Sequence, residues 1–395
     1  MTARSSWLAL LAVATGAAVA CRENPAAPAT TYSTVTVVLD TINFGANNDR
    51  YTNGWLGTTA LVSPDGFVSV LGWDSFNGLL RYHGCAGACA NPASWKAGTV
   101  EVGTGPGWQN LVGNAAQTAA GIHFVYQDGQ GLHYLSCPAA CDVVANWTGT
   151  ELFAGSGELG YAEATPLAAD VSGRLHLLFY DPADSTLHYT SCAGGCSSPT
   201  SWHDVQVDTA SIYPWTWLIA VAPSGTAHAF YQTNAGWMHA SCSAGCTDAG
   251  SWRSELLAND TSSVLVATAS LAFGPDGRLQ LAYAHYVDYR VRYATCASPC
   301  TPPAKWSLTA LPDSASVVSL AADRQGRLFL ATSWRTVSLT TCVADCLDPG
   351  SWQPSALVSP LGRGEVSVAL DAAGRPLVAS SYGGFPTVLQ YSETQ

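Results

Sequence analysis

Cysteines are the chemically reactive residues that recur along the whole of this sequence. The pattern Cys, three residues, Cys, five residues, Trp occurs six times with the same inner spacing. Two thiols this close can form a small disulfide loop or supply two thiolate ligands to zinc. No His or second Cys pair recurs with ligand spacing, so we expect disulfides and no bound metal. The expected pairs are Cys85 with Cys89, Cys137 with Cys141, Cys192 with Cys196, Cys242 with Cys246, Cys296 with Cys300 and Cys342 with Cys346.

A second group of residues, between the repeated motifs, has the chemistry of a sugar-binding site. Aromatic rings stack on the C–H faces of sugars, and carboxylates and amides bind the hydroxyl groups. The alternative is that part of these aromatics close the ends of the structural units. Acidic loop pairs can also hold calcium, but no EF-hand-like run occurs and we expect no other cofactor. The candidate ligand-binding residues are Trp55, Trp73, Asp74, Trp108, Asp128, Trp215, Tyr286, Asp288, Trp334 and Arg335.

The elements that must position these residues follow from the repeat itself. Successive copies begin 46 to 55 residues apart, a period that suits four-stranded blades of a β-propeller. A turn with glycine precedes each Cys pair, such as Pro64-Asp65-Gly66 and Pro275-Asp276-Gly277, and separates strand A from strand B. Strand C ends at the first Cys, and strand D begins at the Trp.

The count of strands predicts how the ring closes. There are seven sets of strands A to C but only six strands that begin at the repeated Trp. Residues 33–39 alternate in the manner of a strand and can supply the missing one. We therefore predict an all-β fold, a seven-bladed propeller of four-stranded blades closed by an N-terminal strand. A six-bladed ring with an additional hairpin is the alternative.

This strand order also predicts two different faces. The connections from B to C and from D to A lie on one face, which carries the candidate ligand-binding residues. The Gly turns and the Cys pairs lie on the other. The repeated Trp is expected to pack between blades, because it recurs at one spacing.

The repeat resembles the sialidase-like, or BNR-like, propellers. Gly121-Ile122-His123-Phe124-Val125-Tyr126 and Leu175-His176-Leu177-Leu178-Phe179-Tyr180 show the resemblance best, although the full Asp-box, Ser-x-Asp-x-Gly-x-x-Trp, is absent. The family includes sialidases, polysaccharide lyases and glycan-binding proteins, so the fold does not determine the function. The arginines expected of a sialidase are not found near a central site. Arg174, Arg278, Arg327 and Arg375 follow the Gly turns on the opposite face.

A lyase of this class implies His and Tyr as acid and base near a charge-neutralising group. His123, Tyr126 and His133 are the candidates for these catalytic roles. The competing interpretation is that His123, His176 and His228 occupy one equivalent position of strand B. In that case they are structural residues held by hydrogen bonds.

Composition and the N-terminus indicate an exported protein. The net charge of -12, with only 11% charged residues, argues against nucleic acid or an anionic membrane surface as the partner. The apolar run from Trp7 to Ala20 is too short for a transmembrane helix and is typical of a signal sequence. It ends in Ala18-Val19-Ala20-Cys21, which resembles a bacterial lipoprotein signal with Cys21 as the lipidated residue. Arg22 after it implies sorting to the outer membrane; a secreted protein cut near Ala20 is the alternative.

These observations predict residues 1–20 as a lipoprotein signal peptide, 21–32 as a tether and 33–395 as one propeller domain. The predicted function is non-catalytic binding of a glycan or a surface protein by a surface or periplasmic lipoprotein. Contact with the membrane is expected through the N-terminal lipid only. A polysaccharide-active enzyme, either a lyase or a glycosidase, is one alternative. A structural subunit of an envelope complex is the other.

Overall fold

The computed structural model describes residues 34–42, 56–74, 78–102, 113–128, 131–154, 159, 166–208, 212–233, 235–258, 268–285, 288–359, 364–382 and 387–394. The chain divides into two units, Met1–Thr30 and Thr31–Gln395, and every described residue belongs to the second unit. The proposed signal peptide and Cys21 therefore lie outside the described residues. Within the described ranges, no helix is long and apolar enough to cross a lipid bilayer.

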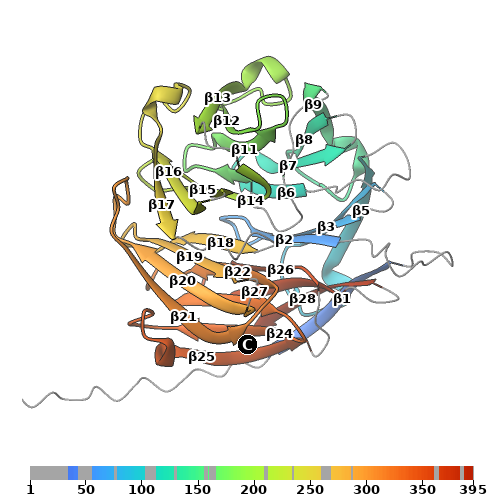
Figure 1. The fold of residues 1–395 in the computed structure, drawn as a ribbon. Helices are drawn as coiled ribbons and strands as arrows, with labels where there is room; N and C mark the ends of the chain where they lie inside the picture. Colours follow the sequence, from blue (N-terminus) through green and yellow to red (C-terminus); the bar gives the residue numbers. More distant parts are fainter. Residues whose placement is uncertain are drawn as a thin grey trace, which may run out of the picture. The chain divides into compact units, whose positions relative to one another are not determined.

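The second unit is a seven-bladed β-propeller, and each blade is an antiparallel sheet of four strands (Figure 1). The seven-bladed prediction is confirmed, and the six-bladed alternative is wrong. The first three blades are β2 (Leu56–Val62), β3 (Val68–Asp74), β4 (Leu79–Cys85) and β5 (Trp95–Glu101); β6 (Gly113–Thr118), β7 (Gly121–Asp128), β8 (Gly131–Cys137) and β9 (Thr148–Ala154); and β10 (Leu167–Ala169), β11 (Leu175–Asp181), β12 (Thr186–Cys192) and β13 (His203–Asp208).

The next three blades are β14 (Ile212–Val221), β15 (Ala227–Thr233), β16 (Gly236–Cys242) and β17 (Arg253–Ala258); β18 (Ala269–Phe273), β19 (Leu279–Ala284), β20 (Arg290–Cys296) and β21 (Trp306–Ser314); and β22 (Val317–Ala322), β23 (Leu328–Ser333), β24 (Val337–Cys342) and β25 (Trp352–Ser359). The described 3-10 helices are η1 (Pro92–Ser94), η2 (Val144–Asn146), η3 (Pro199–Ser201), η4 (Ala249–Ser251) and η6 (Pro349–Ser351).

The seventh blade joins the two ends of the ring. It consists of β26 (Val366–Leu370), β27 (Pro376–Tyr382), β28 (Thr387–Thr394) and the N-terminal strand β1 (Thr34–Ile42). β1 runs antiparallel to β28, with Thr34 opposite Thr394 and Ile42 opposite Thr387. The predicted closure by the N-terminal strand is confirmed. It gives the last blade the same four strands as the others and so removes an unpaired edge.

Each of the six predicted disulfides forms within its own loop, with Cα atoms 5.5 to 5.8 Å apart. In five of the loops the residue just before the second Cys has a positive φ; examples are Ala88 at 52° and Gly245 at 65°. In the same five loops the indole N–H of the repeated Trp donates to the carbonyl oxygen of the second Cys. The five bonds are 2.8 to 3.1 Å long. The Cys pair and its Trp therefore form one local unit.

The repeated Trp also joins neighbouring blades, as expected. Its ring meets, edge to face, a side chain of strand C of the preceding blade, which in five of the six pairs lies three residues before the first Cys. The six pairs are Tyr82 with Trp147, Tyr134 with Trp202, Tyr189 with Trp252, His239 with Trp306, Tyr293 with Trp352, and Tyr391 with Trp95. Centroid distances run from 4.8 to 6.2 Å. The last pair spans the closure between the seventh blade and the first.

Hydroxyl groups of the A strands connect the blades near the axis of the ring. Thr268 accepts a hydrogen bond from the backbone N–H of Val318, and Ser319 accepts one from Val368. Ser367 of the last blade accepts one from Ala60 of the first, at 3.0 Å. The hydrophobic core lies between blades rather than at the centre: seven buried clusters each combine residues of two neighbouring blades.

Candidate functional site

The antiparallel order of the strands places the ends of strand B and the starts of strand C on the face opposite the disulfides. We call this the variable face. Trp55, Trp108 and Tyr286, predicted for this face, lie outside the described residues. Asp74 ends β3 and Trp215 belongs to β14, but their side chains are outside the description. The described candidates are Trp73, Asp128, Asp288, Trp334 and Arg335.

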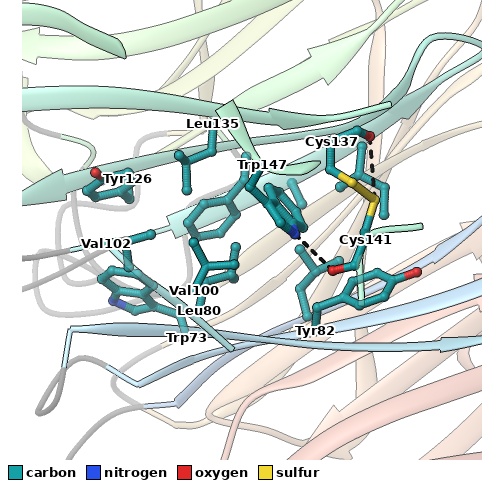
Figure 2. Close-up of a cluster of buried hydrophobic side chains, with 14 residues drawn as sticks. Trp73, Leu80, Tyr82, Val100, Val102, Tyr126, Leu135, Cys137, Cys141 and Trp147 are labelled. Atoms are coloured by element: carbon teal, nitrogen blue, oxygen red, sulfur yellow. Dashed lines mark hydrogen bonds between the residues drawn. A yellow bond between two sulfur atoms is a disulfide. The ribbon is translucent and has the colours of Figure 1, made fainter. Parts of the chain in front are cut away.

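Trp73 is a packing residue in this structure, not an exposed platform. Its side chain is 2% exposed and lies between the first two blades. The indole ring stacks on Tyr126 at 5.6 Å and contacts Phe124 at 5.7 Å. Figure 2 shows it inside the cluster that also contains Trp147 and Tyr82. Leu71 and Trp73 face the second blade, and Val68 and Val70 face the seventh, so both sides of β3 are covered up to its end.

The three candidate catalytic residues do not converge. The ring of His123 contacts the Tyr134 hydroxyl at 2.6 Å and the Thr118 hydroxyl at 2.8 Å. Tyr126, three residues along β7, points to the other side of the sheet and stacks on His133 at 4.8 Å. Burial lowers the pKa of His123 to about 4 and raises the pKa of Tyr126 to about 12. These shifts leave a neutral imidazole and a protonated phenol near pH 7.

The structural interpretation of the repeated histidines accounts for these contacts. His123, His176 and His228 occupy the same position of strand B, one residue after the position opposite the first Cys. The first two contact the Tyr hydroxyl of strand C at 2.6 and 2.7 Å. His228 contacts His239 at 3.1 Å, because His239 stands where the other blades have Tyr. All three side chains are buried.

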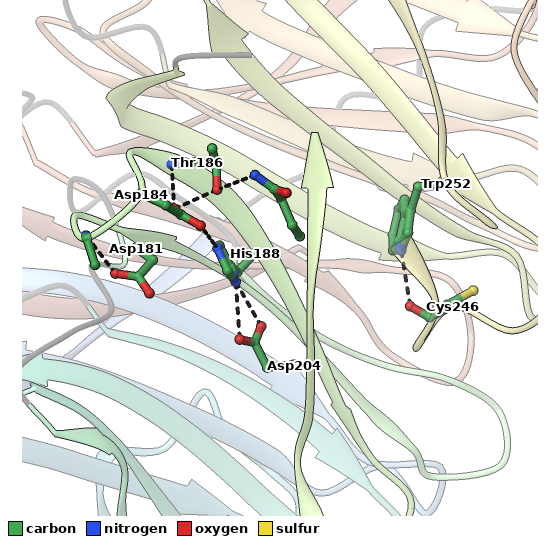
Figure 3. Close-up of polar contacts among 9 residues, drawn as sticks. Asp181, Asp184, Thr186, His188, Asp204, Cys246 and Trp252 are labelled. Carbon is green, nitrogen blue, oxygen red and sulfur yellow. Dashed lines mark hydrogen bonds and ion pairs between the residues drawn. The ribbon is translucent and has the colours of Figure 1, made fainter. Parts of the chain in front are cut away.

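Carboxylates on the variable face hold imidazoles in three blades. Asp128 contacts His133 at 2.8 Å, and Asp288 contacts His285 at 2.8 Å. In the third blade His188 lies between two acids, with Asp184 at 2.9 Å from Nε2 and Asp204 at 3.1 Å from Nδ1 (Figure 3). Burial disfavours the charged imidazole, but the hydrogen bonds to Asp204 and Asp184 outweigh it. They raise the pKa of His188 to about 9.

One group on this face has donor atoms close enough to surround a cation. Oxygen or nitrogen atoms of Asp181, Asp184 and His188 lie within 4.8 Å of one another. Both ring nitrogens of His188 already face carboxylates, and at neutral pH both carry a proton. A doubly protonated imidazole cannot donate a lone pair to a metal. The contacts are those of an ion-paired histidine, which the sequence did not reveal because Asp204 belongs to a different strand.

The described aromatic pair that reaches the surface of this face lies between the fifth and sixth blades. The rings of Tyr289 and Trp334 are 4.3 Å apart, and both side chains are partly exposed. Arg335 beside them is exposed, and Asp288 is held by Arg292 at 2.9 Å. Tyr289 has a φ of 54°, a backbone conformation that a bulky residue rarely adopts. Tyr289 was not among the predicted site residues; its place directly after Asp288 was the available signal.

Comparisons with known proteins identify the fold of this chain but not its function. No protein-family model matches the chain, and no curated protein does. Among solved structures, AofleA from Arthrobotrys oligospora is similar with a TM-score of 0.53 and 11% identity over 85% of this chain and 91% of that one. The polysaccharide lyase Uly1 has a TM-score of 0.53 and 10% identity over 92% and 99%. Hydrazine synthase of Kuenenia stuttgartiensis has a TM-score of 0.54 and 11% identity over 86% and 96%. At these identities the similarity establishes a shared β-propeller fold.

Proposed function

We propose that this protein binds a glycan on its variable face, without catalysis. The observation that supports this most is the partly exposed pair of Tyr289 and Trp334, bordered by Asp288 and Arg335. The two rings contact each other at 4.3 Å with a tilt of 35°, and a sugar can stack on the ring surface that stays exposed. The neighbouring carboxylate and guanidinium can then bind hydroxyl or acidic groups of that sugar.

The separation of the acid–base candidates favours binding over catalysis. His123 faces one side of its sheet, and Tyr126 with His133 faces the other. The fold similarity to a protein named a polysaccharide lyase keeps lyase activity as the second candidate. In that case Tyr126, His133 and Asp128, which form one stacked and hydrogen-bonded row, are the residues to test.

A glycan array followed by calorimetry with the purified chain tests the proposal. Trp334→Ala is expected to weaken glycan binding about thirtyfold, because a stacking platform at a hot spot contributes 2 kcal/mol or more. Its melting temperature should remain that of the parent. Assays for new reducing ends and for unsaturated sugars, run in parallel, distinguish binding from hydrolysis and from elimination. Unchanged affinity in Trp334→Ala, or no glycan bound at all, would refute the proposed site.

We also propose that Cys21 carries a lipid that anchors the protein in the outer membrane. The support is the sequence Ala18-Val19-Ala20-Cys21 after an apolar run. Expression in a Gram-negative host with labelled fatty acid tests it. The parent should incorporate the label and fractionate with outer membranes, and Cys21→Ser should do neither. Label-free parent protein in the medium would support the secreted alternative.

A further inference from the structure

The joint between the fourth and fifth blades departs from the rule that the other Cys–Trp units follow. The side chain that meets the repeated Trp is His239, where all five of the other pairs have Tyr. The indole N–H of Trp306 donates to the carboxylate of Glu255 at 3.1 Å and not to the second Cys carbonyl. These departures meet at one place, beside the Cys296–Cys300 loop.

Proline explains the departure of the loop. The residue before the second Cys has a positive φ in the other five loops, but here it is Pro299, whose ring fixes φ near -65°. The positive φ moves one residue along, to Cys300 at 50°. The hydrogen bond of the turn involves Cys300 as well: its backbone N–H donates to the carbonyl oxygen of Ala297 at 2.9 Å. Cys300 is therefore presented differently from the second Cys of any other loop.

The shifted loop brings Cys300 against two buried histidines. One donor atom each of His228, His239 and Cys300 lie within 4.8 Å of one another, and all three residues are buried. The facing nitrogens, His228 Nδ1 and His239 Nε2, are 3.1 Å apart. Two imidazole nitrogens on one tetrahedral ion at about 2.0 Å each are separated by a similar distance.

A carboxylate fixes the tautomer of one of these histidines. Oε1 of Glu255 lies 3.0 Å from His239 Nδ1, and its other oxygen accepts from the backbone N–H of Ala304 at 2.7 Å. A carboxylate can only accept here, so Nδ1 of His239 carries the proton and Nε2 presents its lone pair. A carboxylate behind a histidine in this manner is the usual support of a zinc-bound imidazole.

We propose that reduction of the Cys296–Cys300 disulfide creates a binding site for a zinc-like divalent cation, formed by His228, His239 and the Cys300 thiolate. A dithiol gives two electrons and two protons to the disulfide, yields two cysteine thiols and becomes a disulfide itself. Binding of the cation releases the Cys300 thiol proton to water. His228 changes tautomer: its Nδ1 loses a proton and its own Nε2 gains one. Nδ1 of His228 and Nε2 of His239 then both have a free lone pair and bind the cation. Cys296 or water completes the coordination.

The proposal can be tested without a reductant, because Cys296→Ser frees the Cys300 thiol and keeps the other five disulfides. The full chain carrying this substitution is titrated with Co²⁺, whose visible absorption reports tetrahedral sites and whose near-ultraviolet charge-transfer band reports thiolate ligation. We expect one equivalent of Co²⁺ with both signatures, displaced by Zn²⁺. The parent with its disulfide should show neither. Adding His239→Tyr, which restores the residue used by the other blades, should abolish both signals.

Two further variants separate this site from ordinary thiol binding. Cys242→Ser frees Cys246, which by the repeat lies beside Tyr189, and it should bind no Co²⁺ tightly. Glu255→Gln on the Cys296→Ser background should weaken binding about 10- to 100-fold while keeping the spectrum. Equal binding by Cys242→Ser, or no effect of His239→Tyr, would overturn the proposal. Should Cys296→Ser not fold, the parent is titrated with a dithiol while the free thiols are located by alkylation. A folded parent reduced at Cys300 that takes up no Co²⁺ would overturn the proposal equally.

Discussion

At the scale of single residues, the tryptophans whose side chains the structure describes are either buried in joints between blades or partly exposed. Trp252 is 5% exposed, donates to Cys246 and meets the ring of Tyr189 at 5.0 Å. Trp252→Ala should therefore lower the free energy of unfolding by about 3–5 kcal/mol, as large-to-small changes in a core do. Trp334→Ala, at a partly exposed position, is the matched control and should change it little. Urea unfolding of both variants measures the difference, and equal losses would show that Trp334 is also a core residue.

His188 gives the stability of the protein a pH dependence of known sign. Its pKa is raised in the folded chain from the usual 6.5 to about 9, so the folded state binds this proton more tightly than the unfolded one. The contribution is complete below pH 6.5 and is lost as the pH rises through about 9. Replacement by Gln should therefore lower the urea midpoint at pH 6 but much less at pH 10. A difference between parent and His188→Gln that stays constant over this range would contradict the ion pairs with Asp184 and Asp204.

Sequence reasoning succeeded for residues whose role repeats and failed where one side chain meets another from a different strand. The disulfide pairs and the inter-blade Trp could be read from spacing alone. The position of His188 between two carboxylates could not, because Asp204 belongs to β13 and lies two residues from Gln206, the residue opposite His188. The burial of Trp73 could not be predicted either, because it depends on contact with Tyr126 of another blade.

At the scale of elements, β1 shows how the chain uses a two-faced strand to close a ring. Val37 is 3% exposed and Val38 is 53% exposed, so neighbouring residues of one type face opposite sides. Val37→Asp should lower the melting temperature of the whole propeller, because it places a charge in the closing sheet. Val38→Asp should leave it nearly unchanged. If the two variants melt together, β1 does not contribute to the closure that its pairing with β28 indicates.

The element level was the most predictable part of this protein. Four strands per blade follow from a period near 50, a Gly turn, a strand that ends at Cys and a strand that begins at Trp. Because the unit is repeated, a strand assigned in one copy can be compared with the same segment in the other copies. The need for a partner at the last blade then assigned the N-terminal strand. The loops of the variable face follow no repeat, so their residues had to be judged one at a time.

At the scale of the molecule, the core is distributed over seven joints between blades and has no single centre. Each blade therefore depends on two neighbours, and the ring should unfold as one body. Scanning calorimetry of residues 31–395 is expected to give one endotherm, with Val37→Asp shifting it as a whole. Two separated endotherms, or a shift of only part of the heat, would show that some blades unfold independently.

The pairing of β1 with β28 has a consequence for how the protein is made. The first strand leaves the ribosome, and in an exported chain enters the new compartment, long before Thr387–Thr394 exists to receive it. Until then β1 is a strand without a partner, and the blades formed before it form an open arc with an unpaired edge at the end. A chain that stalls before Thr387 keeps this unpaired edge, which is a template for pairing with other chains. Only the arrival of this eight-residue strand gives β1 its partner and removes that edge.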